Sequence, residues 1–367
     1  MKHILCIIGQ LGNGGSEKQL YLFLKHLDKK KYSASVFVTS SDRGVWADRI
    51  SENLGIQITF TEEVSIFSKI LYYRQELQRK KPDVIFSWSF FTNPLGCISK
   101  GIRFVGSLRQ QFSYESTDNL GLFRSWLARK PIKIVVNSNY IYNQLLKTNL
   151  HPEKIKVIFN IFEPDIEYEE KSVALQTKHD FFKKYDISKD AVIVMGIGRN
   201  SSAKNFPFFV DVVETAREKL PEIHGVLIGS GGTAIWDDIE NRGLSESFTV
   251  TGEVSSVQKF LEMADIFFLS SRKEGLANVL IEAVNAGCAS LATDVGGVRD
   301  VFHKVPDDLL GKILITTDDV NIAAEMLVNL ASDVDLRTKV VDCTSKFIDE
   351  LAPGKIMRQY YEVLFPN

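Results

Sequence analysis

Two cations on one loop are the first residues of this 367-residue chain whose types suggest chemistry. Arg199 and Lys204 lie five positions apart, directly after the apolar run Ala191–Ile197. An arginine fork and a lysine point charge at the end of a strand suit a diphosphate. The alternative is a solvated loop that carries two ordinary surface charges.

Two carboxylates follow a second apolar run. Glu274 comes after Ile266–Leu269, and Glu282 lies within the short apolar stretch Val279–Ala286. A carboxylate among apolar neighbours needs a polar partner, and carboxylates accept hydrogen bonds from sugar hydroxyls. Since the turn between them precedes a helix, its free amides could also bind a phosphate. The alternative for Glu282 is a salt bridge to a neighbouring lysine or arginine.

Glycine-rich turns follow other apolar runs. In the first, Gly9–Gln19, Ser16 and Gln19 have the spacing of a capping box, so a helix is expected to begin there and to attract an anion. In another, Gly296 and Gly297 would let a helix start close to a ligand. A plain turn between a strand and a helix is the alternative in both places.

The elements that must position these residues are short, β-branched runs that alternate with amphipathic stretches. Such runs predict parallel strands buried on both faces, and hence two doubly wound α/β domains. The runs are Ile4–Ile8, Val36–Thr39, Val84–Phe86, Phe104–Val105, Ile134–Val136, Val157–Phe159, Ala191–Ile197, Val226–Ile228, Phe248–Val250, Ile266–Leu269, Ala289–Ala292 and Ile313–Ile315. Because ligands bind outside the carboxyl ends of such strands, a cleft between the domains is the expected site.

The length of the chain supports two domains. We expect residues 1–165 to form the first, residues 166–350 the second, and residues 351–367 a helix that packs back toward the first; the polar stretch from Glu163 to about Asp190 is the expected linker. Residues 1–165 contain 23 Lys and Arg against 14 Asp and Glu, a net of +9, whereas residues 166–367 contain 21 against 32, a net of −11. A basic half suggests an anionic partner, although chance is an equal alternative.

Several segments together resemble the retaining glycosyltransferases of family 4, the group 1 glycosyltransferases of the GT-B fold. Glu274 and Glu282 match the family's Glu-x7-Glu pair, with Gly275, Asn278 and Val279 between them. The other matching segments, in chain order, are Gly14–Glu17, Val136–Ser138, Lys154–Asn160, Gly198-Arg199 with Lys204-Asn205, Val226–Gly232, Thr251–Val254 and Asp294–Asp300. The resemblance covers nearly the whole chain. It implies two Rossmann-like domains that face each other across a cleft.

The resemblance also implies roles. The catalytic residues would be Arg199 and Lys204 on the donor diphosphate and Glu274 on a donor sugar hydroxyl, while Glu282 would hold the ribose. The other donor-binding residues would be Gly14, Gly15, Gly198, Gly252, Glu253, Val254, Gly275, Leu276, Asn278 and Val279. Among them, the three after the run Phe248–Val250 would lie near the base.

The first domain departs from the family pattern. Many members carry a His after the strand that matches Val84–Phe86, whereas no His lies between His26 and His151 here. A retaining transferase can work without it, because the leaving phosphate oxygen can take the proton of the acceptor hydroxyl. As acceptor-side candidates we take Trp88, Asn93 and Arg109.

The function expected from the resemblance is a retaining hexosyl- or N-acetylhexosaminyltransferase that uses a nucleotide diphosphate sugar, most simply a UDP-sugar. The acceptor would be a hydroxyl of a glycan or a lipid-linked glycan, and the pathway would build a cell-surface polysaccharide. A sugar-nucleotide epimerase or hydrolase of the same fold is one alternative, and a non-catalytic two-domain sugar-binding protein is another. We expect no metal, no other cofactor and no nucleic acid partner.

A membrane partner is suggested by segments that mix cations with large apolar residues, such as Arg124–Lys130. They suit an anionic membrane surface, but a solvated face with Trp126 in the core fits equally well. The four cysteines are far apart, which favours reduced thiols in a cytoplasmic protein, at the inner face of the cell membrane if the basic domain binds there.

Overall fold

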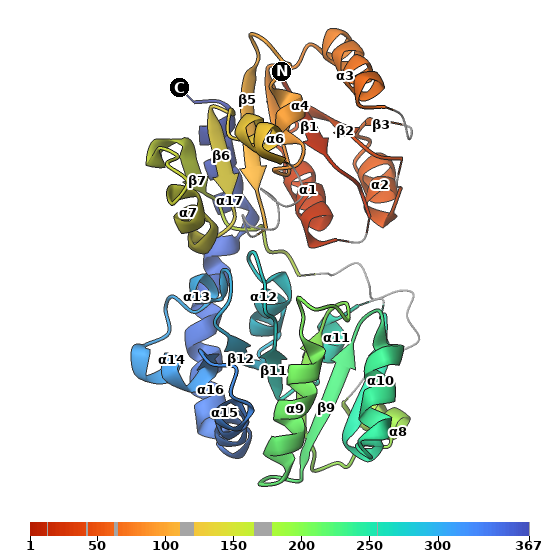
Figure 1. The fold of residues 1–367 in the computed structure, drawn as a ribbon, viewed down its shortest axis with the longest axis vertical. Coiled ribbons are helices and arrows are strands. Elements are labelled where there is room, and N and C mark those ends of the chain that lie inside the picture. The colour runs from red at the N-terminus through yellow and green to blue at the C-terminus, as the bar shows by residue number, and fades with distance from the viewer. Residues whose placement is uncertain are drawn as a thin grey trace. The chain divides into compact units, whose positions relative to one another are not determined.

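A computed structural model describes residues 1–12, 14–41, 43–61, 65–110, 121–164, 178–254 and 256–366. The chain forms two units: unit 1 comprises Met1–Ile161 and Leu351–Asn367, and unit 2 comprises Phe162–Glu350 (Figure 1). Each unit is a parallel β-sheet covered by helices, which confirms the expected α/β class. Residues 165–177 of the expected linker lie outside the described residues, and α8 (Lys178–Tyr185) occupies much of the rest.

Unit 1 holds a seven-stranded sheet with the order β3-β2-β1-β4-β5-β6-β7. Its strands are β1 (Lys2–Ile8), β2 (Tyr32–Val38), β3 (Ile58–Phe60), β4 (Val84–Ser87), β5 (Arg103–Leu108), β6 (Lys133–Val136) and β7 (Ile155–Val157). All of their pairings are parallel. The strand order reverses direction between β1 and β4, and this is where a doubly wound sheet binds ligands.

Alternating side chains of these strands face opposite sides of the sheet, with one core cluster on one side and two on the other. Ile4, Cys6 and Ile8 of β1 face the core shared with α1 (Gly15–Lys25), α2 (Val45–Asp48) and α17 (Pro353–Leu364). Leu5 and Ile7 face the opposite core, to which Tyr73 belongs. The helices on that second face are α3 (Ile66–Lys80), α4 (Asn93–Gly96), α6 (Gly121–Ala128) and α7 (Asn139–Leu146). Short helical turns also lie at Arg49–Asn53 and Pro152–Lys154.

The C-terminal helix α17 is built into unit 1. Its Tyr360 is buried, with its ring centroid 5.1 Å from that of Phe23 in α1. The Arg103 Nη2 atom donates a hydrogen bond of 2.9 Å to the carbonyl of Val363. The Tyr361 hydroxyl accepts one of 2.8 Å from the amide of Asp28. These contacts make the last residues of the chain part of the first core.

Unit 2 holds a six-stranded parallel sheet with the order β10-β9-β8-β11-β12-β13. Its strands are β8 (Val192–Ile197), β9 (Ile223–Ile228), β10 (Phe248–Gly252), β11 (Ile266–Leu269), β12 (Ala289–Thr293) and β13 (Leu314–Ile315). Its other helices are α9 (Phe206–Arg217), α10 (Gly232–Asn241), α11 (Gln258–Leu261), α12 (Asn278–Asn285), α13 (Val298–Val301), α14 (Asp307–Ile313), α15 (Val320–Ser332) and α16 (Val334–Thr344), with 3-10 turns at Ser245–Ser247 and Ser345–Leu351.

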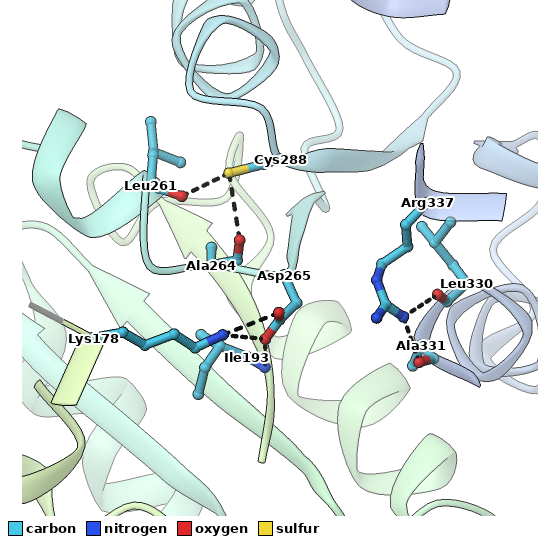
Figure 2. A network of polar contacts seen from close by, with 9 residues as sticks. All are labelled: Lys178, Ile193, Leu261, Ala264, Asp265, Cys288, Leu330, Ala331 and Arg337. Carbon is cyan, nitrogen blue, oxygen red and sulfur yellow. Dashed lines mark hydrogen bonds and ion pairs between the residues drawn. The ribbon is translucent and has the colours of Figure 1, made fainter. Parts of the chain in front are cut away.

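A polar network fixes the amino ends of the two central strands, as Figure 2 shows. The Asp265 carboxylate, just before β11, accepts a hydrogen bond of 2.9 Å from the amide of Ile193 in β8. It also pairs with the Lys178 ammonium at 2.9 Å. Nearby, the Cys288 thiol donates to the carbonyl of Leu261, and Arg337 donates to the last carbonyls of α15. Because this network holds β8 against β11 at their amino ends, it fixes where their carboxyl ends lie.

Several local expectations were wrong. The strand Ile58–Phe60 was not expected, the strand expected at Val157–Phe159 lies at Ile155–Val157, and Ile313 ends α14. The capping box is also wrong: Gly14 is the N-cap of α1 and has no side-chain cap. The Gln19 side chain instead makes two hydrogen bonds to the backbone of Ile161, of 2.9 and 2.8 Å. A long-range partner therefore competes successfully with the local cap.

Among the described helices, none has both the length and the apolar character to cross a membrane.

Candidate active site

The sequence-predicted residues of unit 2 gather where its strand order reverses. The next strand in the chain after β8 is β9 on one side, whereas β11 lies on the other side. The loops after β8 and β11 therefore flank the crevice in which doubly wound sheets bind ligands. Lys204 lies on the first loop and Glu274 on the second. Although they are 70 residues apart in sequence, the topology brings them together.

Lys204 and Glu274 form an ion pair, with 2.7 Å between Lys204 Nζ and Glu274 Oε1. The Ser271 hydroxyl donates a hydrogen bond of 2.7 Å to the same carboxylate oxygen. Both side chains are largely buried, with exposed fractions of 23% for Lys204 and 12% for Glu274. The serine was not predicted, because nothing in its spacing distinguishes it from an ordinary loop residue.

Backbone contacts tie the two loops together beneath this pair. The Ser270 hydroxyl donates to the carbonyl of Lys204 at 2.9 Å. The amide of Arg272 donates to the carbonyl of Ala203 at 2.7 Å. The ammonium and the carboxylate are therefore held from both sides by a preformed scaffold.

The turn after β12 supports the Glu274 loop. Gly296 has a positive φ of +54°, and a Cβ atom there would lie 2.1 Å from the carbonyl oxygen of Glu274. The amide of Gly297 donates to the carbonyl of Gly275 at 2.6 Å. Glycine is thus required at position 296 both by backbone conformation and by close approach. The turn at Gly296 and Gly297 therefore contacts the backbone of the loop that carries the Glu274 carboxylate. Helix α13 begins directly after this turn.

Helix α12 begins beside the same loop. Asn278 is its first residue, and the N-cap residue, Ala277, makes no side-chain cap hydrogen bond. Leu276 is buried, so a ligand could meet only its backbone, whereas Val279 and Glu282 are half-buried. The backbone amides at this helix start can therefore serve an anion. Glu282 follows one turn into the helix.

Arg199 differs from Lys204 in its surroundings. It is exposed, and within the described part of the chain it has neither a hydrogen bond nor an ion pair. Its neighbour Asn200 is fixed, since its amide donates to the carbonyl of Ser230 at 2.8 Å and its side chain to that of Gly231 at 3.0 Å. A guanidinium on a fixed backbone is thus available to an anion.

A cavity of about 640 Å³ lies next to this loop. Gly252 and Glu253, which were predicted to lie near the base, belong to its lining, and the aromatic residues Tyr185 and Trp236 were not predicted. The complete lining consists of Tyr185, Gly229, Ser230, Gly231, Gly232, Thr233, Trp236, Ser245, Phe248, Thr249, Val250, Thr251, Gly252 and Glu253. The size and the mixed lining suit a nucleoside-sized ligand. Val254 follows this lining and is half-buried.

The predicted residues of unit 1 lie at the carboxyl ends of its own strands. Gly14 and Gly15 open α1 after β1. Trp88, which follows β4, donates from Nε1 to the carbonyl of Ser16 at 2.9 Å. The Arg109 guanidinium lies 3.8 Å from the centroid of the Trp88 ring.

The side chains of Trp88, Asn93 and Arg109 are buried among residues of unit 1. Arg109 Nη2 donates a hydrogen bond of 2.8 Å to the Tyr360 hydroxyl, and Asn93 Nδ2 donates one of 3.0 Å to the carbonyl of Ala128. The contacts of Trp88, Asn93 and Arg109 are therefore internal ones, and their role toward an acceptor stays a prediction. In the described ranges, no three His, Cys, Asp or Glu side chains gather into a group that could hold a metal ion.

Comparisons with known proteins show which family the chain resembles. Residues 191–333 match the family described as "Glycosyl transferases group 1", and residues 13–165 match "Glycosyltransferase Family 4". The chain is 25% identical over 313 residues to the capsular polysaccharide biosynthesis glycosyltransferase CapH of Staphylococcus aureus. This alignment covers 80% of this chain and 82% of CapH.

Two further similarities extend over most of the chain. It is 22% identical over 291 residues to the UDP-Gal:alpha-D-GlcNAc-diphosphoundecaprenol alpha-1,3-galactosyltransferase of Escherichia coli, which covers 74% of this chain and 72% of that enzyme. The crystal structure of Anabaena HepE in complex with UDP superposes with a TM-score of 0.82 at 16% identity and covers 99% of both chains. The fold is therefore GT-B.

Proposed function

Because the chain belongs to the group 1 glycosyltransferases of family 4, we propose that it moves a sugar, with retention of configuration, from a UDP-sugar to a hydroxyl of a glycan or lipid-linked glycan. The observation that carries this proposal is the Lys204–Glu274 pair, held at 2.7 Å at the point where the strand order of unit 2 reverses. The likeness to HepE, whose structure contains UDP, supports the choice of nucleotide. The likeness to the E. coli enzyme named for a diphosphoundecaprenol substrate supports the lipid-linked acceptor.

In this proposal the donor extends from the cavity to the ion pair. The base occupies the cavity beside Gly252, Glu253 and Val254, and Glu282 holds the ribose hydroxyls. Arg199 and Lys204 bind the diphosphate, with the amides at the start of α12. Because cations already offset the phosphate charge, we expect transfer to continue when divalent metal is chelated.

The reaction needs no nucleophile from the protein. The bond between C1 of the donor sugar and the β-phosphate oxygen breaks, and the acceptor oxygen bonds to C1 on the same face. The acceptor proton passes to the leaving phosphate oxygen. Glu274 orients the sugar through a hydroxyl, and Lys204 stabilises the charge that develops on the diphosphate. Gly14 and Gly15, at the start of α1, are proposed to let the backbone of unit 1 approach the acceptor closely.

The proposal is tested by nucleotide binding. UDP should raise the apparent melting temperature by mass action, more than GDP, ADP or CMP does, and EDTA should leave this shift unchanged. Glu282→Ala should reduce the shift, because it removes the ribose contact. The matched control is Glu325→Ala, which removes an exposed carboxylate from α15 in the same unit. An equal UDP shift in the two folded variants would refute the role of Glu282, and no UDP shift in the wild-type protein would refute the donor site.

A further inference from the structure

The large apolar side chains that are exposed lie mostly in unit 1. In the described part of the chain, unit 2 contributes only Ile322 and Val334 to this set. Those of unit 1 are Met1, Val45, Ile66, Phe67, Leu71, Tyr72, Leu122, Phe123, Trp126, Ile132 and Tyr140. Seven of these eleven belong to two helices, α3 and α6. Clusters of this kind mark interaction surfaces more often than scattered single residues do.

Helix α6 turns its large apolar residues outward. Leu122, Phe123 and Trp126 are 87%, 70% and 54% exposed, whereas Ser125 and Ala128 face the sheet. The rings of Phe123 and Trp126 stack with their centroids 6.0 Å apart. The alternative left open by the sequence, in which Trp126 belongs to the core, is therefore wrong.

Cations border this apolar face. The Lys130 ammonium lies 3.8 Å from the centroid of the exposed Trp126 ring. Arg124, between the exposed apolar residues, is itself exposed. An indole or phenyl ring with a cation beside it suits the boundary between lipid headgroups and acyl chains, where one end of the pair is apolar and the other is wet.

Helix α3 repeats the pattern on the same face of the sheet. Phe67 and Leu71 are 77% and 60% exposed, and the exposed Arg74 continues the same helical face. Tyr73 of α3 packs in the core that contains Leu5 and Ile7, and the alternation along the strands puts this core on the side covered by α6. Both helices therefore lie over one face of unit 1.

The charge of the chain selects the partner. Residues 1–165, which contain both helices, have 23 Lys and Arg against 14 Asp and Glu and therefore a net charge of +9. Exposed apolar groups on a basic surface complement an anionic bilayer, to which cations and inserted aromatics contribute together. A second copy that docked this same surface against its own would instead bring like charges together.

We propose that α3 and α6 form a surface through which unit 1 binds an anionic lipid bilayer. Phe123 and Trp126 enter the headgroup region, and Arg124 and Lys130 remain at the level of the lipid phosphates. This surface deepens the proposed function by naming the partner that brings unit 1 to a lipid-linked acceptor. It does not depend on donor binding in unit 2.

The test is flotation of the whole protein with vesicles of equal parts phosphatidylcholine and phosphatidylglycerol, against pure phosphatidylcholine. The wild-type protein should float with the anionic vesicles at low salt and less at high salt. Phe123→Ser with Trp126→Ser should lower the partition coefficient roughly tenfold or more, because two inserted rings are lost. The matched control, Ile322→Ser with Val334→Ser, removes exposed apolar residues from unit 2 and should float as the wild type does.

The charges are tested separately. Arg124→Glu with Lys130→Glu should lower binding to anionic vesicles roughly tenfold or more. The control is Lys219→Glu with Lys312→Glu, which makes the same charge change on exposed residues of unit 2. Equal loss in this control would overturn the proposal, since binding would then follow net charge alone.

Other outcomes would also overturn it. One is a wild-type protein that stays unbound to anionic vesicles at low salt. Another is a dimer in light scattering that Phe123→Ser with Trp126→Ser converts to a monomer without a change in flotation, since the surface would then bind a second copy. The UDP melting shift, measured on every variant, reports on unit 2 by itself. Its absence would contradict the proposed function and leave the flotation result valid.

Discussion

The Lys204–Glu274 pair contains two groups to which the proposed reaction gives different tasks. Lys204→Met should weaken UDP binding about 10- to 100-fold, because a hydrogen bond to a charged group contributes about 1.5–3 kcal/mol. Glu274→Gln should leave UDP affinity within about threefold, since its proposed contact is with the sugar that UDP lacks, but should lower kcat strongly. Isothermal titration with UDP and turnover of the UDP-sugar measure the two effects.

The ion pair could instead serve only to hold the two loops together, and the two variants distinguish this alternative from the proposed roles. Each removes one partner of a largely buried pair, so each should cost some stability. If both variants lost UDP affinity in proportion to their loss of melting temperature, the residues would act by holding the loops. The division of tasks would then be wrong.

Gly296 offers a test of how the carboxylate is positioned. Gly296→Ala should destabilise unit 2 by more than about 1 kcal/mol, because the residue has a positive φ and the new Cβ atom would meet the carbonyl of Glu274. It should also lower kcat. The control is Gly287→Ala, whose φ of +79° imposes a similar backbone strain while no atom lies within 4 Å of its Cβ position. Urea unfolding and turnover should separate them: equal kcat values would show that the close approach at Gly296 does not position Glu274.

At the scale of elements, the β9–β10 pair contains a group that makes stability depend on pH. His224 of β9 is buried, with Nε2 2.9 Å from the Thr249 hydroxyl of β10. Burial, together with the nearby charge of Arg217, lowers its pKa from 6.5 to about 4. Between these values the unfolded chain binds a proton that folded His224 does not. The free energy of unfolding of unit 2 should therefore keep the full contribution of neutral His224 above pH 6.5. It should fall as the pH drops toward 4.

Near pH 4 the loss in free energy of unfolding should reach about 3 kcal/mol, because a difference of one pKa unit corresponds to about 1.4 kcal/mol. His224→Gln keeps a partner for Thr249 but cannot be protonated, so its stability should fall less steeply with pH than that of the wild-type protein. Burial also lowers the pKa of His3 in unit 1, and this contribution is common to both proteins. Parallel pH profiles from urea unfolding would contradict the role of His224.

The sequence predicted most elements but not their finer contacts. Buried runs such as Ile266–Leu269 are recognisable because both faces are apolar, whereas β3 has three half-buried residues and gives no such signal. In α6, the spacing of Leu122 and Trp126 is the same for a core face and for an exposed one. Only the packing of Ala128 against the sheet decides which face is buried.

The contact between Lys204 and Glu274 could be expected only because the resemblance supplied both residues together. No local pattern could pair residues 70 positions apart, and none marked Ser271, Tyr185 or Trp236, which reach the site through the topology of the sheet. The contacts of Arg109 could not be read from the sequence either, because its partner Tyr360 comes from the other end of the chain.

At the scale of the whole molecule, this last contact predicts how the chain unfolds. The chain passes between the units twice, and α17 completes the core of unit 1 after unit 2 has ended. Tyr360→Ala should destabilise unit 1 by about 3–5 kcal/mol, because it empties a core position and leaves the buried Arg109 without its hydroxyl partner. Tyr140→Ala, which truncates a tyrosine at the surface of the same unit, is the control.

Hydrogen exchange resolved by peptide can assign the loss to one unit. In Tyr360→Ala, peptides from β1, β4 and α1 should exchange faster, and peptides from β8 and β11 should keep their protection, since the contacts of Tyr360 lie within unit 1. Added UDP should increase protection in unit 2 and leave the peptides of unit 1 unchanged. If the substitution accelerated exchange equally in both units, the chain would unfold as one cooperative body, and α17 would stabilise more than the core into which it packs.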